Sequence, residues 1–334
     1  MNGLERSLGF ISGKAVDHPP FLPIVMRWAA RYAGVPYRDF CLIPQAKAMA
    51  MAKVAEDFAI DWLTVMSDPY CEAEAFGLQV EYPADNLPIE KGGHLSEAEA
   101  AFDLKPYDWR EHKRCCNRVE EIKAMVELSR GQHLIVGWVE GPMAEYADIR
   151  GVSEAAMDLI EEPEAVRHAM GVIVESALPF ALAQVEAGAH CIGIGDAFAS
   201  QIGPKLYREF VFDLEKQLVE AIHAAGGLTK IHICGNISSL LPDLIKTGSD
   251  IIDIDHLVPD LSPFAPLLAE GQVFSGKADP VSIIQDGTPE QIEASVRAIH
   301  GETNGRCIVS AGCEVPPDTS VANMLAFSRA ARSL

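Results

Sequence analysis

His232, Cys234 and Cys313 are the side chains whose types and spacing point most directly to chemistry. His232 and Cys234 follow an apolar run over residues 227–231, and a β-strand directs residues two apart to the same face. Cys313 follows a second apolar run, over residues 306–309. If the two strand ends are neighbours, the three side chains offer a zinc ion one imidazole and two thiolates and leave a fourth position free, as in a catalytic site. The alternative is a buried imidazole with two unreactive thiols, because free cysteine is often buried.

A zinc ion with two thiolate ligands and one imidazole is electron-rich, so it generates hydroxide poorly and suits a substrate thiol in the open position. Metal coordination keeps such a sulfur deprotonated at neutral pH and provides a nucleophile without a general base. The three residues therefore predict alkylation of sulfur. Before substrate binds, an oxygen ligand could fill the open position, and Asp255, at the next strand end, is the candidate on spacing.

The composition restricts the partners of the protein. Its formal net charge of -21 at pH 7 disfavours nucleic acid and anionic membranes, which require clustered Lys and Arg to neutralise phosphates. We expect a small molecule or another protein instead. The chain shows neither the pattern of a signal peptide nor a run of about 18 apolar residues, so we expect a cytoplasmic protein that does not enter a membrane. Its eight cysteines are expected to be thiols or metal ligands rather than disulfides.

Alternating strand and helix patterns predict the fold. Nearly continuous apolar runs indicate eight strands, at residues 21–26, 61–67, 134–139, 191–195, 228–233, 250–254, 272–276 and 307–310. Helix patterns occur at residues 44–59, 108–129, 163–187, 204–225, 237–247, 261–269, 289–300 and 320–332. Eight buried strands alternating with helices indicate an α/β protein, a closed parallel (β/α)₈ or TIM barrel. We predict one domain over residues 1–334, with an N-terminal extension and a loop or hairpin excursion at residues 70–106.

Polar residues gather at the carboxyl ends of the predicted strands, where barrel enzymes place their chemistry. They are Arg27, Asp68, Glu140, Asp196, His232, Cys234, Asp255, His256, Lys277, Asp279 and Cys313. The opposite strand ends carry few such residues. Helix capping is an alternative role for Asp68, Asp196 and Asp279, because aspartate caps helices well. Capping does not explain the imidazole and the two thiols together.

The chain also resembles a known family. Over nearly its whole length and in the same order, it is similar to uroporphyrinogen decarboxylase in the segments MRWAARY (26–32), MSD (66–68), EGP (140–142), SGKADP (275–280) and PD (317–318). The resemblance implies a single (β/α)₈ barrel. Within that superfamily, HICG (232–235) and GCEVPPD (312–318) resemble the zinc motif of the methylcobalamin:coenzyme M methyltransferases. Those enzymes move a methyl group from a corrinoid cofactor, carried by a small protein, to a zinc-bound thiolate.

Several departures from the decarboxylase pattern argue against porphyrinogen decarboxylation. Cys313 stands where the decarboxylase has a histidine, and the decarboxylase lacks the pair formed here by His232 and Cys234. Its substrate-contacting tyrosine falls near residues 146–148 without a clean match, and its serine falls at Ala197.

Three other residues match the decarboxylase. Arg27 and Arg31 correspond to arginines that hold substrate carboxylates, and Asp68 corresponds to the aspartate that contacts the pyrrole N–H groups. Their presence implies either an anionic substrate tail or the packing of a shared scaffold. Two arginines near one rim can hold a sulfonate or a carboxylate through paired hydrogen bonds.

The favoured function is that of a zinc-dependent corrinoid methyltransferase. His232, Cys234 and Cys313 are the predicted zinc ligands, and Asp68 is counted with them as catalytic. The predicted substrate-binding residues are Arg27, Arg31, Glu140, Asp196 and Asp255. The resemblance implies two partners, a protein that presents a methylcorrinoid and a thiol such as coenzyme M. Another acceptor, or transfer from an ether or amine onto the corrinoid, is left open.

Two alternatives come from other classes of function. One is uroporphyrinogen decarboxylase itself, which needs no cofactor and would use Asp68 as its central group. The other is a barrel that binds a corrinoid or a porphyrin without turnover. Metal content separates the first alternative from the methyltransferase, and loss of the methylcobalamin absorption band on addition of thiols separates the second.

Overall fold

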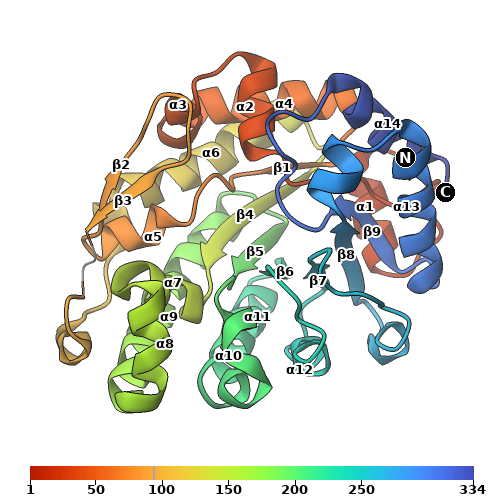
Figure 1. Cartoon of the computed structure of the whole chain (residues 1–334). Coiled ribbons are helices and arrows are strands. Elements are labelled where there is room, and N and C mark those ends of the chain that lie inside the picture. Colours follow the sequence, from red (N-terminus) through yellow and green to blue (C-terminus); the bar gives the residue numbers. More distant parts are fainter. Residues whose placement is uncertain (93–94) are drawn as a thin grey trace.

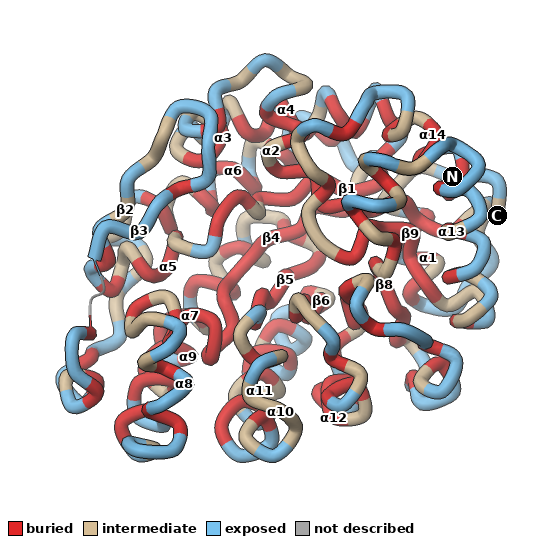
Figure 2. Tube along the Cα trace, in the orientation of Figure 1, coloured by how far each residue is buried: buried red, intermediate tan, exposed pale blue. Residues whose placement is uncertain are grey.

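The computed structural model describes residues 1–92 and 95–334 and shows a curled parallel sheet wrapped by helices (Figure 1). Seven strands pair in the order β1-β4-β5-β6-β7-β8-β9, and all neighbouring pairs are parallel. They are β1 (Trp62–Thr64), β4 (Leu134–Glu140), β5 (Cys191–Gly195), β6 (Leu228–Ile233), β7 (Ile251–Ile254), β8 (Val273–Ala278) and β9 (Cys307–Ala311). Their residues are almost all buried (Figure 2), as expected for a parallel sheet covered on both faces.

The segment over residues 20–25 lies between the first and last strands of the sheet and closes it into a barrel. Phe21 forms a parallel bridge with Val309 of β9. On the other side, the Phe21 carbonyl accepts a hydrogen bond of 2.9 Å from the Asp61 N–H, just before β1. The predicted (β/α)₈ barrel is therefore confirmed.

The first predicted strand, at residues 21–26, is much shorter than expected. It is reduced to the single bridge at Phe21, whereas the other seven predicted strands are present. Pro20 and Pro23 flank the bridge and have no N–H group to donate to a neighbouring strand. The apolar run belongs to the barrel as predicted, but its prolines limit its hydrogen bonding to the neighbouring strands.

Helices surround the barrel (Figure 1). They are α1 (Gly3–Ile11), α2 (Met26–Ala33), α3 (Tyr37–Leu42), α4 (Pro44–Phe58), α5 (Tyr70–Ala75), α6 (Lys113–Ser129), α7 (Pro142–Arg150), α8 (Val152–Glu161), α9 (Pro163–Glu186), α10 (Ala199–Leu206), α11 (Phe212–Ala224), α12 (Leu241–Lys246), α13 (Pro289–Glu302) and α14 (Val321–Arg332). The helices predicted at α4, α6, α9, α11, α13 and α14 are confirmed.

Several helix predictions need correction. Residues 261–269 form only a short 3₁₀ turn at Ala265–Leu267, because prolines interrupt the segment. Helix α12 is shorter than the predicted 237–247. Helices α1, α2, α3, α5, α7 and α8 were not predicted. Helix α1 nevertheless carries a readable signal, a capping box in which Asn2 and Glu5 each bond the other's backbone N–H.

The predicted excursion contains a hairpin. Strands β2 (Gln79–Glu81) and β3 (Ile89–Gly92) pair antiparallel outside the main sheet. Helix α5 precedes the hairpin, and two short 3₁₀ turns, Ala98–Asp103 and Trp109–Glu111, follow it. Residues 93–94 of the predicted excursion lie outside the described part of the chain.

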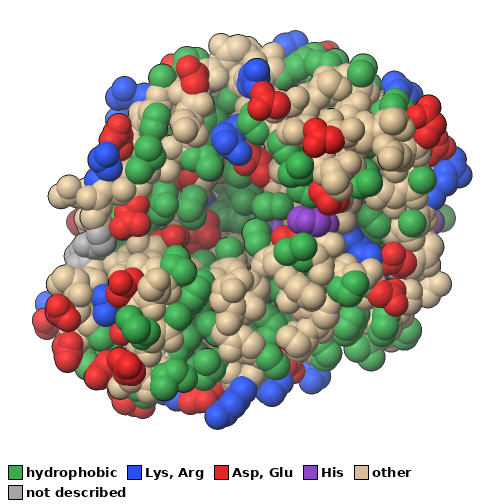
Figure 3. All heavy atoms as spheres, viewed as in Figure 1, with side chains coloured by type: hydrophobic (Ala, Val, Ile, Leu, Met, Phe, Trp, Pro, Cys, Tyr) green, Lys and Arg blue, Asp and Glu red, His purple; other side chains and the backbone are tan. Residues whose placement is uncertain are grey.

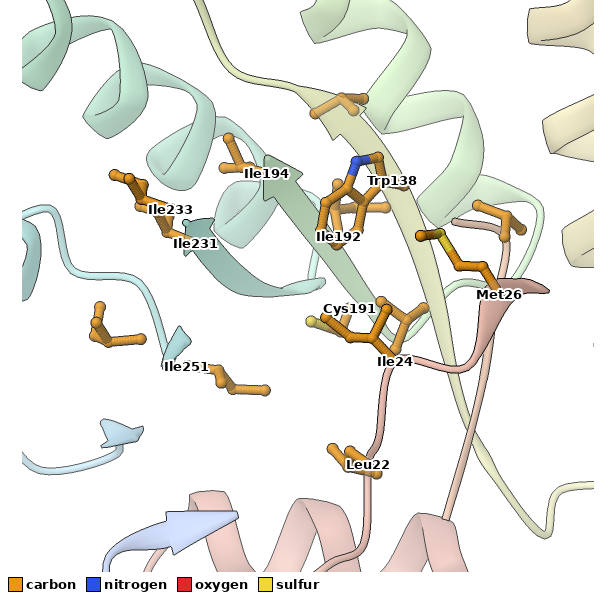
Figure 4. Packing of buried hydrophobic residues seen from close by; sticks show 14 of the residues in the cluster. Leu22, Ile24, Met26, Trp138, Cys191, Ile192, Ile194, Ile231, Ile233 and Ile251 are labelled. Carbon is orange, nitrogen blue, oxygen red and sulfur yellow. The ribbon is translucent and has the colours of Figure 1, made fainter. Parts of the chain in front are cut away.

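Trp138 of β4 fills the barrel interior against β5 (Figure 4). A Cβ atom at Gly193 would lie 2.2 Å from its indole ring, and one at Gly195 would lie 2.7 Å from it. Glycines at these two positions of β5 therefore allow the indole to lie across the strand. Lys230 of β6 lies over the same ring, 5.9 Å from its centroid, and over Trp62 of β1 at 5.2 Å. The side chain of Lys230 therefore packs against both indoles.

Helix α9 is long and apolar enough to cross a membrane by length and composition alone. Of its most apolar window, 56% is buried inside the protein. It packs against β4, α7 and α11. Burial against these elements accounts for its apolar residues.

Asp61 offers a test of barrel closure. Its carboxylate accepts a hydrogen bond of 2.8 Å from the Phe21 N–H and pairs with Arg6 of α1 at 2.5 Å. We expect Asp61→Ala to lower the free energy of unfolding by about 3 kcal/mol, because it leaves a buried N–H and a largely buried guanidinium without this acceptor.

Urea denaturation measures the change. The exposed residue Asp103 provides the control, since Asp103→Ala should alter stability by less than about 0.5 kcal/mol. An Asp61 variant as stable as this control would show that the contact contributes nothing to closure.

Candidate metal centre and active site

His232, Cys234 and Cys313 come together at the carboxyl end of the barrel. The His232 Nε2 atom lies 3.1 Å from the Cys234 sulfur, and the two sulfurs are 3.7 Å apart. All three donor atoms lie within 4.8 Å of one another. The imidazole is buried and the two cysteines are half-buried. The three predicted ligands thus form one compact cluster.

The two strands that lead to this cluster are not neighbours, contrary to the arrangement considered from the sequence. Strands β7 and β8 lie between β6 and β9. Cys313 reaches the other two residues because the chain after β9 crosses the ends of both intervening strands. The Gly312 N–H donates a hydrogen bond of 2.8 Å to the Ala278 carbonyl at the end of β8. A Cβ atom at Gly312 would lie 2.4 Å from the backbone nitrogen of His256, which follows β7. Only glycine permits that approach.

A buried carboxylate fixes the orientation of the imidazole. His232 Nδ1 lies 2.7 Å from Asp253 Oδ2, and Lys230 Nζ lies 2.6 Å from the same oxygen. Asp253 is fully buried on β7, beside β6. The pKa of Asp253 is lowered because the nearby Lys230 and His232 outweigh the opposing effect of burial. With Nδ1 bonded to this carboxylate, Nε2 is the nitrogen that faces the thiols.

Asp253 and Lys230 were not predicted as site residues. The sequence did contain a signal for both. Lys230 alternates with His232 along β6, and Asp253 interrupts the apolar run Ile251–Ile254. A charged residue inside a buried strand requires a partner, and residues two apart on a strand share a face.

The three side chains of the cluster shift one another's pKa values. Cys313 has a pKa lowered to about 4, because it accepts a hydrogen bond from Cys234 and faces the positively charged His232, against the opposing effect of burial. The pKa of Cys234 is raised by the same hydrogen bond. Burial lowers the pKa of His232, but hydrogen bonds with Asp253 and Cys313 raise it overall to about 9. A metal ion bound by these three side chains would displace the protons that they otherwise hold.

Asp255 supports the turn that carries Cys234. Its Oδ2 accepts a hydrogen bond of 2.8 Å from the Gly235 N–H, and its Oδ1 accepts one of 2.9 Å from the Leu257 N–H. The carboxylate lies outside the compact group formed by the imidazole and the two sulfurs. In this structure the Asp255 carboxylate braces the turn. Its roles in binding substrate or as an oxygen ligand stay predictions.

Asp68 is engaged in a buried ion pair. Its Oδ2 accepts hydrogen bonds of 2.7 Å from both Arg114 and Ser67, and its Oδ1 accepts one from the Tyr70 N–H at the start of α5. Burial raises the pKa of Asp68, but Arg114 and Arg118 lower it further, so the carboxylate is ionised. Its oxygens are directed to protein groups in this structure.

The other two predicted acids also have internal partners. Glu140 accepts a hydrogen bond of 2.8 Å from the Trp138 indole. Asp196 is fully buried and accepts bonds from the N–H groups of Ala144 (2.7 Å) and Met143 (3.3 Å). Asp196 therefore caps α7, a helix that precedes it in the chain, rather than lining an open mouth. Burial raises its pKa to about 7 despite these two donors.

Arg27 and Arg31 lie beside the loop that follows Cys313. Arg27 pairs with Glu314 at 3.4 Å, and Arg31 pairs with Asp318 and donates to the Pro317 carbonyl at 3.3 Å. Both arginines border a cavity of about 300 Å³. The predicted arginines are thus close together, and the segment that supplies one thiol also supplies their carboxylate partners.

Comparisons with known proteins place the chain in a family. The family model described as uroporphyrinogen decarboxylase (URO-D) matches residues 2–334. The chain belongs to this family of enzymes, as the sequence motifs predicted.

Named relatives include two kinds of enzyme. A methylcobamide:CoM methyltransferase MtbA of Methanosarcina acetivorans is 30% identical, over 84% of this chain and 84% of that protein. A methylcobamide:CoM methyltransferase MtaA of Methanosarcina barkeri is 24% identical over 96% of this chain and 95% of that protein. A uroporphyrinogen decarboxylase of Koribacter versatilis is 24% identical, over 90% and 88%.

The fold has a solved counterpart. The structure of a methyltransferase from Methanosarcina mazei superposes with a TM-score of 0.85 at 21% identity, covering all of this chain and 98% of that one. At this identity the superposition supports the fold, and the barrel assignment agrees with it.

The Asp253 contact generates a prediction about metal affinity. We expect Asp253→Asn to weaken zinc binding about tenfold to a hundredfold, because partners of a ligating histidine tune its basicity and orientation. Competition with a chromophoric chelator measures the affinity.

The control is Asp250→Asn, at the opposite end of the same strand, where the carboxylate contacts Thr229 and His223. Equal zinc affinity in the two variants would show that Asp253 does not act through His232.

Proposed function

We propose that the protein transfers a methyl group between a methylated corrinoid, presented by a partner protein, and a small-molecule thiol, with zinc bound by His232, Cys234 and Cys313. The observation that carries this proposal is the compact group of one imidazole and two thiols at the catalytic end of the barrel. The names of the methyltransferase relatives support the same class of reaction.

The donor set fits zinc. Tetrahedral coordination with Zn–S bonds of about 2.3 Å separates two sulfurs by roughly 3.8 Å, and the sulfurs of Cys234 and Cys313 are 3.7 Å apart. The His232 nitrogen, 3.1 Å from the Cys234 sulfur, is a few tenths of an ångström closer than coordination would set it. Three protein ligands leave one position for a substrate atom.

When bound, zinc in this ligand set would lower the pKa of a coordinating substrate thiol, so that its sulfur is a thiolate at neutral pH. In the proposed transfer, the substrate sulfur would form a bond to the methyl carbon while the bond between that carbon and the corrinoid substrate breaks, and the corrinoid would keep the electron pair of the broken bond. No proton moves in this step. The protein therefore needs no general base at the methyl group.

The chain's own residues prepare this reaction. Asp253 holds His232 with Nε2 toward the two sulfurs, and the buried Lys230 keeps that carboxylate ionised. Arg27 and Arg31 border a cavity that could hold an anionic group of the thiol substrate. Coenzyme M, named for the relatives, carries such a group as a sulfonate, and other anionic thiols satisfy the same requirement.

Decarboxylation is the competing function, and the environment of Asp68 weighs against it. A decarboxylase of this family would direct Asp68 to its substrate. Here Arg114 and Ser67 occupy one carboxylate oxygen and the Tyr70 N–H contacts the other. A decarboxylase would also have no task for two thiols and an imidazole in one cluster.

Zinc content and demethylation test the proposal together. Protein purified without chelator should contain about one zinc per chain and should bleach the absorption band of methylcobalamin when a thiol is added. Cys313→Ser should lose the metal and the demethylation, because only two strong ligands remain.

Cys116→Ser, on α6 and away from the cluster, is the matched control and should retain both properties. A metal-free wild-type protein that forms coproporphyrinogen would establish the decarboxylase instead. Tight tetrapyrrole binding without demethylation by any thiol would indicate a binding protein.

A further inference from the structure

The loop that carries Cys313 has its own set of contacts. We call it the thiol loop: residues 312–320, which connect β9 to α14. Two backbone hydrogen bonds of 2.8 Å fix it close to the thiol. The Gly312 N–H donates to a carbonyl at the end of β8, and the Val315 N–H donates to the Ile24 carbonyl. The thiol lies between these two points.

The Glu314 side chain attaches the thiol loop between these points. Its Oε1 accepts a hydrogen bond of 2.8 Å from the Arg27 N–H, in the first turn of α2. The first N–H groups of a helix have no partner within the helix, and Val25, which precedes α2, makes no side-chain capping bond. A carboxylate 287 positions away along the chain therefore caps this helix.

Glu314 makes two contacts with Arg27, and the backbone contact is the closer. The Arg27 guanidinium lies 3.4 Å from the carboxylate, whereas the N–H lies 2.8 Å from it. The side chain of Arg27 is 28% exposed and that of Glu314 is 12% exposed. Because the bond to the N–H is shorter and is not opposed by an exposed, flexible side chain, we expect it to supply most of the attachment.

Packing covers the thiol loop incompletely. Cys313, Glu314, Pro316 and Pro317 are half-buried, and Asp318 is exposed. Figure 3 shows a hollow at the centre of the face that this loop borders. A segment with few buried contacts depends more on specific hydrogen bonds than a packed strand does. The position of the Cys313 sulfur should therefore be sensitive to the polar contacts of the loop.

Two further contacts hold the distal end of the thiol loop. The Trp28 indole donates to the Thr319 carbonyl at 2.8 Å, and Arg31 pairs with Asp318. The side chains of Arg31 and Asp318 are 65% and 73% exposed, so their ion pair should contribute little. Both contacts come later in the loop than Glu314, which directly follows the thiol in the sequence.

We infer that Glu314 is a positioning residue for the Cys313 thiol: its carboxylate, bonded to the first turn of α2, holds the sulfur beside His232 and Cys234. The inference rests on the proposed function for the zinc ion, whereas the position of the sulfur can also be measured without a metal. The same bond joins the thiol loop to the helix whose arginines border the cavity of about 300 Å³. One attachment therefore serves both the metal ligand and the cavity.

Zinc affinity, measured by competition with a chromophoric chelator, tests the inference with two variants at one position. Glu314→Ala removes the hydrogen-bond acceptor and the negative charge, and Glu314→Gln removes only the charge. We expect Glu314→Ala to bind zinc at least about tenfold more weakly than the wild type, because the support of a ligand is lost. Glu314→Gln should stay within about threefold of the wild type, because its amide oxygen still accepts from the Arg27 N–H.

Asp318→Ala is the matched control. It removes a carboxylate from the same loop, whose ion pair with Arg31 is exposed, and should leave zinc affinity within about threefold of the wild type. Equal affinity in Glu314→Ala and Asp318→Ala would overturn the inference. Equal losses in Glu314→Ala and Glu314→Gln would also overturn it, because the loss would then come from the charge beside the metal and not from the hydrogen bond.

Glu314→Asp keeps the inference testable if Glu314→Ala does not fold. It retains the charge but is one methylene shorter, so it cannot reach the Arg27 N–H unless the loop moves toward α2. It should bind zinc more weakly than Glu314→Gln, although it keeps the negative charge that the glutamine lacks. Urea denaturation of the metal-free protein shows whether each variant is folded. Wild-type zinc affinity in a folded Glu314→Asp protein would contradict the positioning role.

Phenylarsine oxide, a trivalent arsenical, reports the position of the sulfur without a metal. Its arsenic forms bonds to two thiol sulfurs, and its oxygen leaves as water with the two thiol protons. The sulfurs of Cys234 and Cys313, 3.7 Å apart, can bind one arsenic atom together, and Cys234→Ser identifies this binding by its loss. We expect Glu314→Ala to bind the arsenical at least about tenfold more weakly than Glu314→Gln, because the second bond forms readily only while the two sulfurs are held together. Equal binding in both variants would overturn the inference.

The two measurements separate this inference from the proposed function. Zinc binding without demethylation of methylcobalamin would refute methyl transfer, and the zinc affinities would still decide the role of Glu314. A wild-type protein that binds the arsenical but no zinc would refute the proposed metal centre, and the arsenical affinities of the Glu314 variants would then decide. A wild-type protein that binds neither would show that the two sulfurs do not lie together and would overturn both.

Discussion

The contact between Asp253 and its two cationic neighbours is the interaction on which the site depends. One carboxylate oxygen accepts from both Lys230 and His232 in a region closed to water, where such bonds are stronger than at a surface. Lys230 itself lies over the indoles of Trp62 and Trp138. Side chains from four strands therefore set the direction of the His232 Nε2 atom. They hold the imidazole ring toward the two thiols.

Much of this arrangement was predictable because it depends on local chemistry. Apolar runs that alternate with helix patterns predicted the barrel. The residue types at the strand ends predicted that the imidazole and both thiols form one site. The path that brings Cys313 to His232 was not predictable, because β7 and β8 separate their strands. That path depends on the loop after β9, in which Gly312 approaches the backbone of His256 closely. Only the structure shows this approach.

The contacts of the acidic residues could not be predicted from their positions in the sequence. Asp196 stands at a strand end as a catalytic residue would, yet it caps a helix that lies earlier in the chain. Glu72 belongs to the predicted excursion, yet its Oε1 accepts a hydrogen bond of 2.9 Å from the Glu140 N–H at the end of β4. Neither periodicity nor spacing in the sequence predicts such a tertiary contact.

Strand β9 contributes both to the site and to closure of the barrel. It leads to Cys313, and it provides the edge on which the residues around Phe21 settle. During synthesis on the ribosome, the earliest segment must therefore wait for nearly the last one before the barrel can close and the imidazole and both thiols can come together. A chain released before β9 would lack Cys313 and keep an open sheet edge at the same time, a state prone to aggregation and readily recognised by cellular proteases.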